Sequence, residues 1–340
     1  MPDRTTAKDR AWVIFDRIVS DAAPGGRHTN PWVTGQRGEP DYRPDFETLA
    51  KLLGVPLFLR ADSRTGVPAL ALDVWFSYEL RRAGFDPDAT WPRADHPRIL
   101  PMPVVNLLRS LPRPDRERLA ARIRDRKAIA GVTSSSAAIL GKNYVKQVDI
   151  IMTDWSSGPE LLISTKRMDS SYGKNAANRI EESYGDAKNL RLRHPLAALG
   201  FVFGLRSDIL AREPDVAEWL IDLLAKLGRE DDAYHATCLV MIEYDDADAV
   251  PTDSGEEPGH PLVEAGIEPD PDVDEESAIV SAGEVMGALA RLPRVAIRHE
   301  AMPPSLAPAR FLATMVNRVL DTTPVNFHRE ARARRQQARA

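Results

Sequence analysis

The order of apolar segments in the second half of the chain constrains the fold most. Two β-branched runs, 146–155 and 160–168, are joined by the turn sequence SSGP, which predicts a β-hairpin. A helix, a strand, a second helix and a further strand are predicted next, at 174–192, 196–205, 215–228 and 236–245. Strands that alternate with helices predict an α/β fold, with a central mixed β-sheet flanked by helices.

The segments around this core suggest two domains. Residues 1–127 show mainly helical patterns, and we interpret them as a mostly α-helical N-terminal domain that is a candidate for DNA recognition. One of its helices, 43–54, is predicted to end at Gly54 because Pro56 follows. The second domain, 128–340, is predicted to begin with a small-residue helix at 128–140 and to close with helices near 281–291 and 306–320.

Charge is distributed unevenly along the chain. The net charge is −5, but residues 245–276 hold thirteen Asp and Glu and no Lys or Arg, so the rest of the chain has a net charge of +8. This acidic, Pro-rich segment is predicted to be a disordered loop. Residues 101–200 alone carry a net charge of +7, which suits either a phosphate-binding surface or an ordinary solvated one.

Several classes of protein are disfavoured by what the sequence lacks. The single cysteine, Cys238, lies in an apolar strand pattern and is predicted to be a packed core thiol. The first residues lack a signal-peptide core, and the longest apolar run, 195–205, is too short to cross a bilayer. We therefore expect a cytoplasmic protein without a membrane partner. The scattered histidines do not favour zinc, and the sequence SAAILGKN lacks the first Gly and the final Ser/Thr of a phosphate-binding loop.

The predicted hairpin carries charged residues within apolar strands, where unpaired charges are unfavourable. Because side chains alternate along a strand, Glu160, Ser164 and Lys166 are expected to share one face. The hairpin can bring Asp149, in the preceding strand, beside Ser164 and Lys166. A carboxylate that binds a hard cation, next to an ammonium that orients water and offsets negative charge, is what metal-dependent phosphodiester hydrolysis requires.

On these residues, the region 128–245 resembles the PD-(D/E)xK nuclease superfamily, the core of most type II restriction endonucleases. Asp149 and Lys166 match its strand Asp and its Lys, whereas Ser164 stands where the family has Asp or Glu, and Val148 replaces the Pro. The resemblance implies a restriction-endonuclease-like fold, an Mg²⁺ cofactor and DNA cleavage. Asp149 would hold the metal, Ser164 would lie near it, and Lys166 would position the attacking water.

The missing strand carboxylate has a parallel in a subgroup of restriction enzymes that cut sites containing CCGG. These enzymes carry Ser-x-Lys on the strand and take a Glu from the following helix, which here contains RIEE. The apolar stripe is predicted to be Ala177, Ile180, Tyr184 and Ala187. At about 100° per residue, Glu181 falls at the edge of this stripe and Glu182 nearly opposite it. Glu181 is therefore the predicted second metal ligand, with Glu160 as the other candidate.

The implied partner is double-stranded DNA, and a palindromic target would favour a homodimer. The candidate phosphate contacts are Arg167, Lys174, Arg179 and Lys188. Three alternatives remain open: a salt-bridged sheet edge without chemistry, a catalytically inactive DNA-binding protein with the nuclease fold, and a regulatory or interaction protein.

Overall fold

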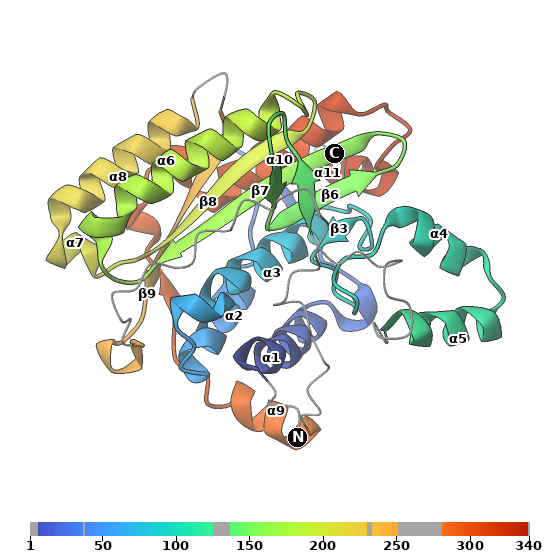
Figure 1. Cartoon of the computed structure of the whole chain (residues 1–340), viewed down its shortest axis with the longest axis horizontal. Coiled ribbons are helices and arrows are strands. Elements are labelled where there is room, and N and C mark those ends of the chain that lie inside the picture. Colours follow the sequence, from blue (N-terminus) through green and yellow to red (C-terminus); the bar gives the residue numbers. More distant parts are fainter. Residues whose placement is uncertain (1–5, 37, 125–136, 230–232, 251–280, 339–340) are drawn as a thin grey trace.

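The structure is a computed structural model that describes residues 6–36, 38–124, 137–229, 233–250 and 281–338. A mixed sheet of six strands lies between two layers of helices (Figure 1). The helices are α1 Ala7–Ala22, α2 Phe46–Phe58, α3 Val67–Arg82, α4 Met102–Ser110, α5 Arg113–Arg124, α6 Tyr172–Arg191, α7 Ile209–Arg212, α8 Pro214–Leu227, α9 Ala282–Leu289, α10 Pro308–Thr322 and α11 Arg329–Gln337. Within these ranges, none of the helices combines the length and the apolar character needed to cross a membrane.

The large sheet has the order β10-β9-β8-β7-β6-β3. Strands β7, β8 and β9 run parallel, whereas β3, β6 and β10 are antiparallel to their neighbours. The small sheets β1-β2 and β4-β5 lie apart from it. The strands are β1 Trp32–Thr34, β2 Pro40–Tyr42, β3 Thr90–Trp91, β4 Ala138–Leu140, β5 Val145–Gln147, β6 Ile150–Asp154, β7 Gly158–Met168, β8 Ala198–Arg206, β9 Ala236–Glu243 and β10 Ala296–Ile297.

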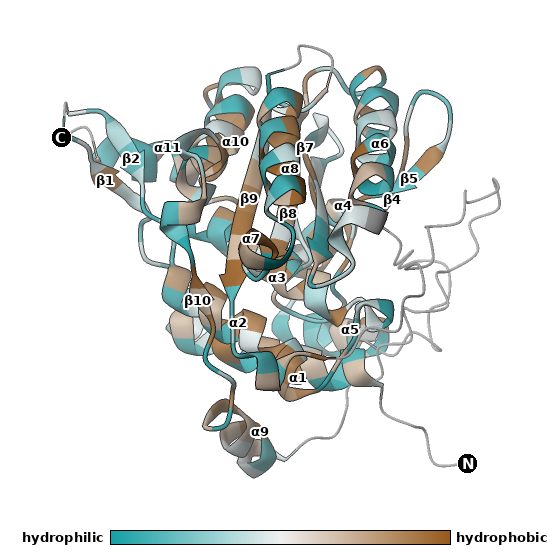
Figure 2. Cartoon of the chain, turned by 90° about the vertical axis from the view of Figure 1, so that its left-hand side faces the viewer, coloured by the Kyte–Doolittle hydropathy of each residue, from teal (hydrophilic) through white to brown (hydrophobic). Residues whose placement is uncertain are grey.

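Both faces of the sheet are buried, which explains why the central strands are apolar almost throughout (Figure 2). Alternate residues point to opposite faces: Leu161 and Ile163 pack with α1–α3 and α10, while Leu162 packs with α6 and α8. Helix α6 connects β7 to β8 and α8 connects β8 to β9, and both crossovers cover the same face. The predicted α/β core with a mixed sheet flanked by helices is thereby confirmed.

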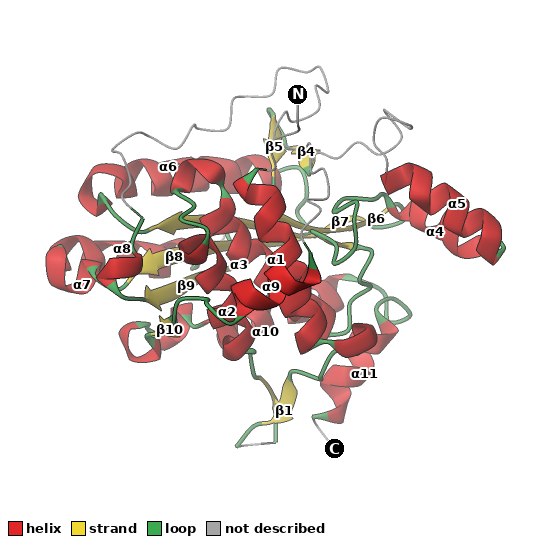
Figure 3. Cartoon of the chain, turned by 90° about the horizontal axis from the view of Figure 1, so that it is seen from below, coloured by secondary structure: helices red, strands yellow, loops and turns green. Residues whose placement is uncertain are grey.

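The N-terminal helices form part of the same packing unit as the sheet. Helices α1, α2 and α3 share one hydrophobic core with strand residues such as Ile150 and Val202, and the short strand β3 joins the sheet beside β6. By contrast, the α4–α5 pair projects to one side with a small core of its own around Val105 and Ile123 (Figures 1 and 3). The boundary predicted at 127/128 lies outside the described residues.

Two predicted helices differ from the structure. Helix α2 continues past Gly54 and Pro56 to Phe58, because this turn is buried and the apolar contacts of Val55 and Leu57 outweigh the hydrogen bond that a proline removes. The helix predicted at 128–140 is wrong at its end, since 138–140 form β4. The rest of that prediction, from 128 to 136, lies outside the described residues, as do residues 251–276 of the predicted disordered loop 245–276. The prediction is wrong at the start of that loop, because Asp246–Asp248 form a 3-10 helix and Asp246 pairs with Arg206. Cys238 is fully buried in β9, which confirms a packed core thiol.

Gly200 is the point where β8 passes closest to α10. A Cβ atom at this position would lie 2.7 Å from Phe311 Cζ and 2.9 Å from Met315 Cε. We expect Gly200→Ala to lower the free energy of unfolding by about 1–3 kcal/mol, because the added methyl group overpacks this contact. Urea denaturation measures the change.

The matched control is Gly185→Ala on α6, where a Cβ would meet no atom within 4 Å. This variant is expected to raise stability slightly, by up to about 1 kcal/mol, because alanine is the better helix former. Equal stability of the Gly200→Ala variant and the unmodified protein would contradict the close approach of β8 and α10.

Candidate active site at the β6–β7 hairpin

Asp149 directly precedes strand β6 and contacts the neighbouring strand β7. The sequence predicted this residue inside a strand, but β6 starts only at Ile150. Ile150 pairs with Ile163, so Asp149 lies opposite the next residues of β7. Its Oδ2 accepts the backbone N–H of Thr165 at 2.8 Å. The carboxylate thus takes the place of a backbone carbonyl in the ladder, and the pairing of the two strands holds it beside Ser164 and Lys166.

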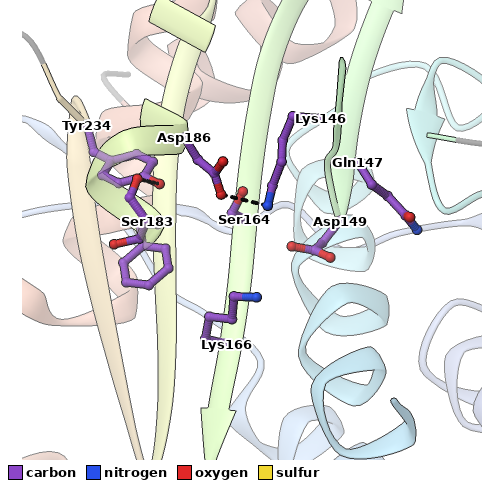
Figure 4. Close-up of a pocket in the computed structure, with 9 residues that line it drawn as sticks. Lys146, Gln147, Asp149, Ser164, Lys166, Ser183, Asp186 and Tyr234 are labelled. Atoms are coloured by element: carbon purple, nitrogen blue, oxygen red, sulfur yellow. Dashed lines mark hydrogen bonds and ion pairs between the residues drawn. The ribbon is translucent and has the colours of Figure 1, made fainter. Parts of the chain in front are cut away.

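Asp149, Ser164 and Lys166 line one small cavity on the sheet face covered by α6 (Figure 4). Its volume of about 10 Å³ is room for about one water molecule. The predicted convergence of these three side chains is therefore observed. The full lining is Lys146, Gln147, Asp149, Ser164, Lys166, Ser183, Asp186, Phe201 and Tyr234.

The orientation of α6 corrects the prediction for its two glutamates. Glu181 is exposed, whereas Glu182 Oε1 lies 3.6 Å from Lys166 Nζ and 3.4 Å from Lys146 Nζ. The predicted helix phase was wrong because Ala177 is exposed and does not belong to the buried stripe. The side chains that α6 does bury are Tyr172, Ala176, Ile180, Ser183, Asp186, Ala187, Asn189 and Leu190. This stripe turns the flank with Glu182 and Asp186 toward the cavity.

Glu160, the other predicted metal ligand, lies elsewhere. The register of β6 and β7 shifts at Pro159 and Leu161, so Glu160 has no residue opposite it. Its carboxylate accepts from Ser157 Oγ at 2.6 Å and pairs with His328 Nε2 at 3.0 Å. Asp149 lies opposite Ser164, and four residues of extended strand, about 13 Å, separate Ser164 from Glu160. Glu160 therefore cannot share a metal ion with Asp149 in this structure.

Lys146 and Asp186 also line the cavity, although neither was predicted from the sequence. Lys146 Nζ, brought in by β5, lies 2.6 Å from Asp186 Oδ2, and Tyr144 donates to Asp186 Oδ1 at 3.0 Å. Two signals were available: Lys146 and Gln147 directly precede the apolar strand with Asp149, and Glu182 and Asp186 stand at i and i+4 on one helix flank.

The charges around Glu182 keep it ionised. Burial works to raise the pKa of Glu182, but the positive charges of Lys166, Lys146 and Arg179 outweigh it and hold that pKa below its ordinary value. Burial likewise opposes the charge of Lys146, yet the hydrogen bond and the charge of Asp186 raise the pKa of Lys146. Both groups are therefore charged at neutral pH.

A further buried carboxyl lies behind the strand. Thr165 donates through its hydroxyl to Asp73 of α3 on the opposite face of the sheet. Burial and the nearby charge of Asp149 raise the pKa of Asp73 well above its usual range. The hydrogen bond to Asp73 stabilises the position of Thr165, whose N–H in turn holds Asp149.

The predicted phosphate contacts divide into two groups. Arg167 is buried and donates to Asp169 Oδ1 and the Pro68 carbonyl, so it does not present its guanidinium to a phosphate. Arg179 is partly exposed, and its Nη1 lies 3.8 Å from Glu182 Oε2. Lys188 lies on α6 over the Tyr184 ring. Lys174 belongs to α6, but its side chain lies outside what the structure describes.

The cavity offers carboxylate oxygens, the ligand type that Mg²⁺ prefers, but only Asp149 and Asp186 supply them in its lining. Among the described residues, no three or more Asp, Glu, His or Cys side chains form a group that could hold a metal ion by themselves. Mg²⁺ commonly binds through one or two carboxylates, with water and substrate phosphate completing its shell. The candidates for these two carboxylates are Asp149, which lines the cavity, and Glu182, which lies 3.6 Å from the cavity residue Lys166.

Comparison of the chain with models of protein families, with characterised proteins and with solved structures finds no match.

Proposed function

We propose that this chain is an Mg²⁺-dependent DNA endonuclease with a restriction-endonuclease-like core of the PD-(D/E)xK type. The observation that carries the proposal is the placement of Asp149 and Lys166 in one cavity, where an antiparallel hairpin leads through α6 into a parallel strand. The net charge of +7 over residues 101–200 supports a polyanionic partner.

In the proposed mechanism, Asp149 and Glu182 would hold the metal ion, and Ser164 lies in the same cavity as Asp149. The ion would polarise the phosphate and make a water molecule more acidic. Lys166 Nζ orients the attacking water and offsets the negative charge that develops on the phosphate. Thr165, fixed by Asp73 behind the strand, keeps Asp149 in place. For a palindromic target, a two-fold dimer would present one such site to each strand.

One observation favours a second candidate, a DNA-binding protein that has the fold without the activity. Glu182 and Asp186 are engaged by Lys146, and the cavity is small. A site whose carboxylates are all neutralised by lysines could be a structural ion-pair network. The two candidates make opposite predictions for the same assay.

The test is the conversion of supercoiled plasmid DNA to nicked and linear forms. We expect cleavage by the full chain with Mg²⁺, none with EDTA, and none by Asp149→Ala, because that variant loses a carboxylate of the metal site. An electrophoretic mobility shift in EDTA measures DNA binding separately. Binding without cleavage under any divalent cation would favour the inactive protein, and cleavage by Asp149→Ala would show that the site is misassigned.

A further inference from the structure

Lys146 is a buried cation that the proposed reaction does not use. Its residue is 9% exposed, and its ammonium lies 2.6 Å from Asp186 Oδ2 and 3.4 Å from Glu182 Oε1. Lysine is almost never this buried without a paired charge. The side chain also lines the cavity shared by Asp149 and Lys166, and it points toward Asp186 (Figure 4).

The small β4–β5 sheet that carries Lys146 is tied firmly to α6. Asn189 Nδ2 donates to the Tyr144 carbonyl at 3.0 Å, and Asn189 Oδ1 accepts from the Asn143 N–H at 2.9 Å. At Gly141 a Cβ would lie 2.1 Å from Asn189 Nδ2, so only glycine fits there. Among the described strands β4 and β5 pair only with each other, and these contacts with α6 fix where the Lys146 ammonium lies.

The formal charges around the cavity cancel. The carboxylates of Asp149, Glu182 and Asp186 supply three negative charges, and the cations that face them supply three positive ones. Those cations are Lys146, Lys166 and Arg179. A divalent ion that approaches Glu182 meets two ammonium groups within 4 Å of the same carboxylate oxygen. Repulsion from these two lysines therefore opposes binding of the ion, and binding also breaks existing ion pairs.

We propose that Lys146 is a built-in counter-ion that competes with the divalent cation for Glu182 and Asp186. It makes metal binding weak by holding both carboxylates in ion pairs. The proposal rests on the proposed function only in that the cavity takes a divalent cation. It makes Lys146 a regulator of metal loading.

The experiment measures Mn²⁺ binding to the DNA-free full chain by isothermal titration calorimetry. Lys146→Gln removes the charge and keeps an amide that can donate to Asp186. We expect its affinity for Mn²⁺ to be about tenfold or more higher than that of the unmodified protein, because one close repulsive charge is gone. Lys146→Arg, which keeps the charge, should bind as weakly as the unmodified protein.

Two further variants guard against an ambiguous result. Lys226→Gln removes an exposed lysine that is paired with Asp222 on α8, so it controls for net charge and should leave Mn²⁺ affinity unchanged. If Lys146→Gln does not fold, as judged by circular dichroism, Lys146→Met takes its place, because methionine removes the charge and keeps the apolar stem. It should likewise bind Mn²⁺ more tightly than the unmodified protein, because the repulsive charge is gone and both carboxylates are kept.

Unchanged affinity in the folded variant that lacks the Lys146 charge, or no detectable Mn²⁺ binding by any of the proteins, would overturn the inference. Failure of the nuclease proposal looks different. Tighter Mn²⁺ binding by Lys146→Gln without plasmid cleavage would support the counter-ion role and remove the nuclease. Cleavage by the unmodified protein with no change of affinity in Lys146→Gln would support the nuclease and exclude the counter-ion role.

Discussion

Replacement of Lys166 by methionine is expected to reduce Mg²⁺-dependent DNA cleavage by about 10³-fold or more, the scale on which pre-organised electrostatic groups act. The Lys166 side chain is largely buried, its Nζ lies 3.6 Å from Glu182 Oε1, and it lines the cavity with Asp149. Methionine keeps the apolar stem and removes the ammonium, so folding should change little. Single-turnover cleavage of a plasmid at saturating Mg²⁺ measures the loss.

The matched control for Lys166→Met is Lys226→Met on α8. Lys226 is exposed and its partner is Asp222, four residues earlier on the same helix. We expect this variant to cleave within about twofold of the unmodified rate, since surface substitutions away from special features are close to neutral. Circular dichroism and a mobility shift in EDTA check that Lys166→Met still folds and binds DNA. Cleavage by Lys166→Met at a near-normal rate would exclude Lys166 from the chemistry.

The second large effect separates two neighbouring glutamates on α6. Glu182→Gln is expected to reduce cleavage by about 10²-fold or more at limiting Mg²⁺ and to shift the Mg²⁺ titration to higher concentration, because it removes one of the two carboxylates of the proposed metal site. Glu181→Gln removes the same charge one residue earlier from an exposed position. It should cleave within about twofold of the unmodified protein.

This pair of variants also tests the orientation of α6. If Glu181→Gln is the damaging change, the helix phase inferred from Ala177, Ile180, Tyr184 and Ala187 is right and the orientation in the structure is wrong. If both variants cleave normally, the second carboxylate comes from neither glutamate, and Asp186 becomes the next residue to replace. Thermal unfolding of both variants shows whether the loss of the Lys146 and Lys166 ion pairs, rather than of the metal ligand, explains the effect.

Local patterns were sufficient for most of the secondary structure. The hairpin, α6, β8, α8 and β9 each show a strong period or a continuous apolar run, and their bounds differ from the prediction by only a few residues. The patterns failed where local signals were outweighed by packing. Pro56 stays inside α2 because its turn is buried, and the run 146–155 is interrupted before β6, which leaves β5 in a separate small sheet.

The candidate site was predictable only where it depends on local patterns. Asp149, Ser164 and Lys166 were identified because strand alternation and a tight turn bring them together whatever surrounds them. The choice between Glu181 and Glu182 depended on which side chains α6 buries. Small residues such as Ala176 and Ala177 give little hydrophobic signal, so a rotation of one residue was not visible in the pattern. Glu160 was misplaced by a bulge that alternation alone does not reveal.

The sequence by itself determined the α/β alternation, the two faces of the hairpin and the meeting of Asp149 with Lys166, because each follows from the period of a single element or of two adjacent ones. Only the tertiary structure decided what faces them. Asp73 reaches Thr165 from α3, ninety-two residues away in the chain. Lys146 meets Asp186 of α6 because the small β4–β5 sheet packs against that helix. Such contacts depend on how separate elements pack against one another, and the burial of apolar surface that drives this packing carries no directional signal in the local sequence.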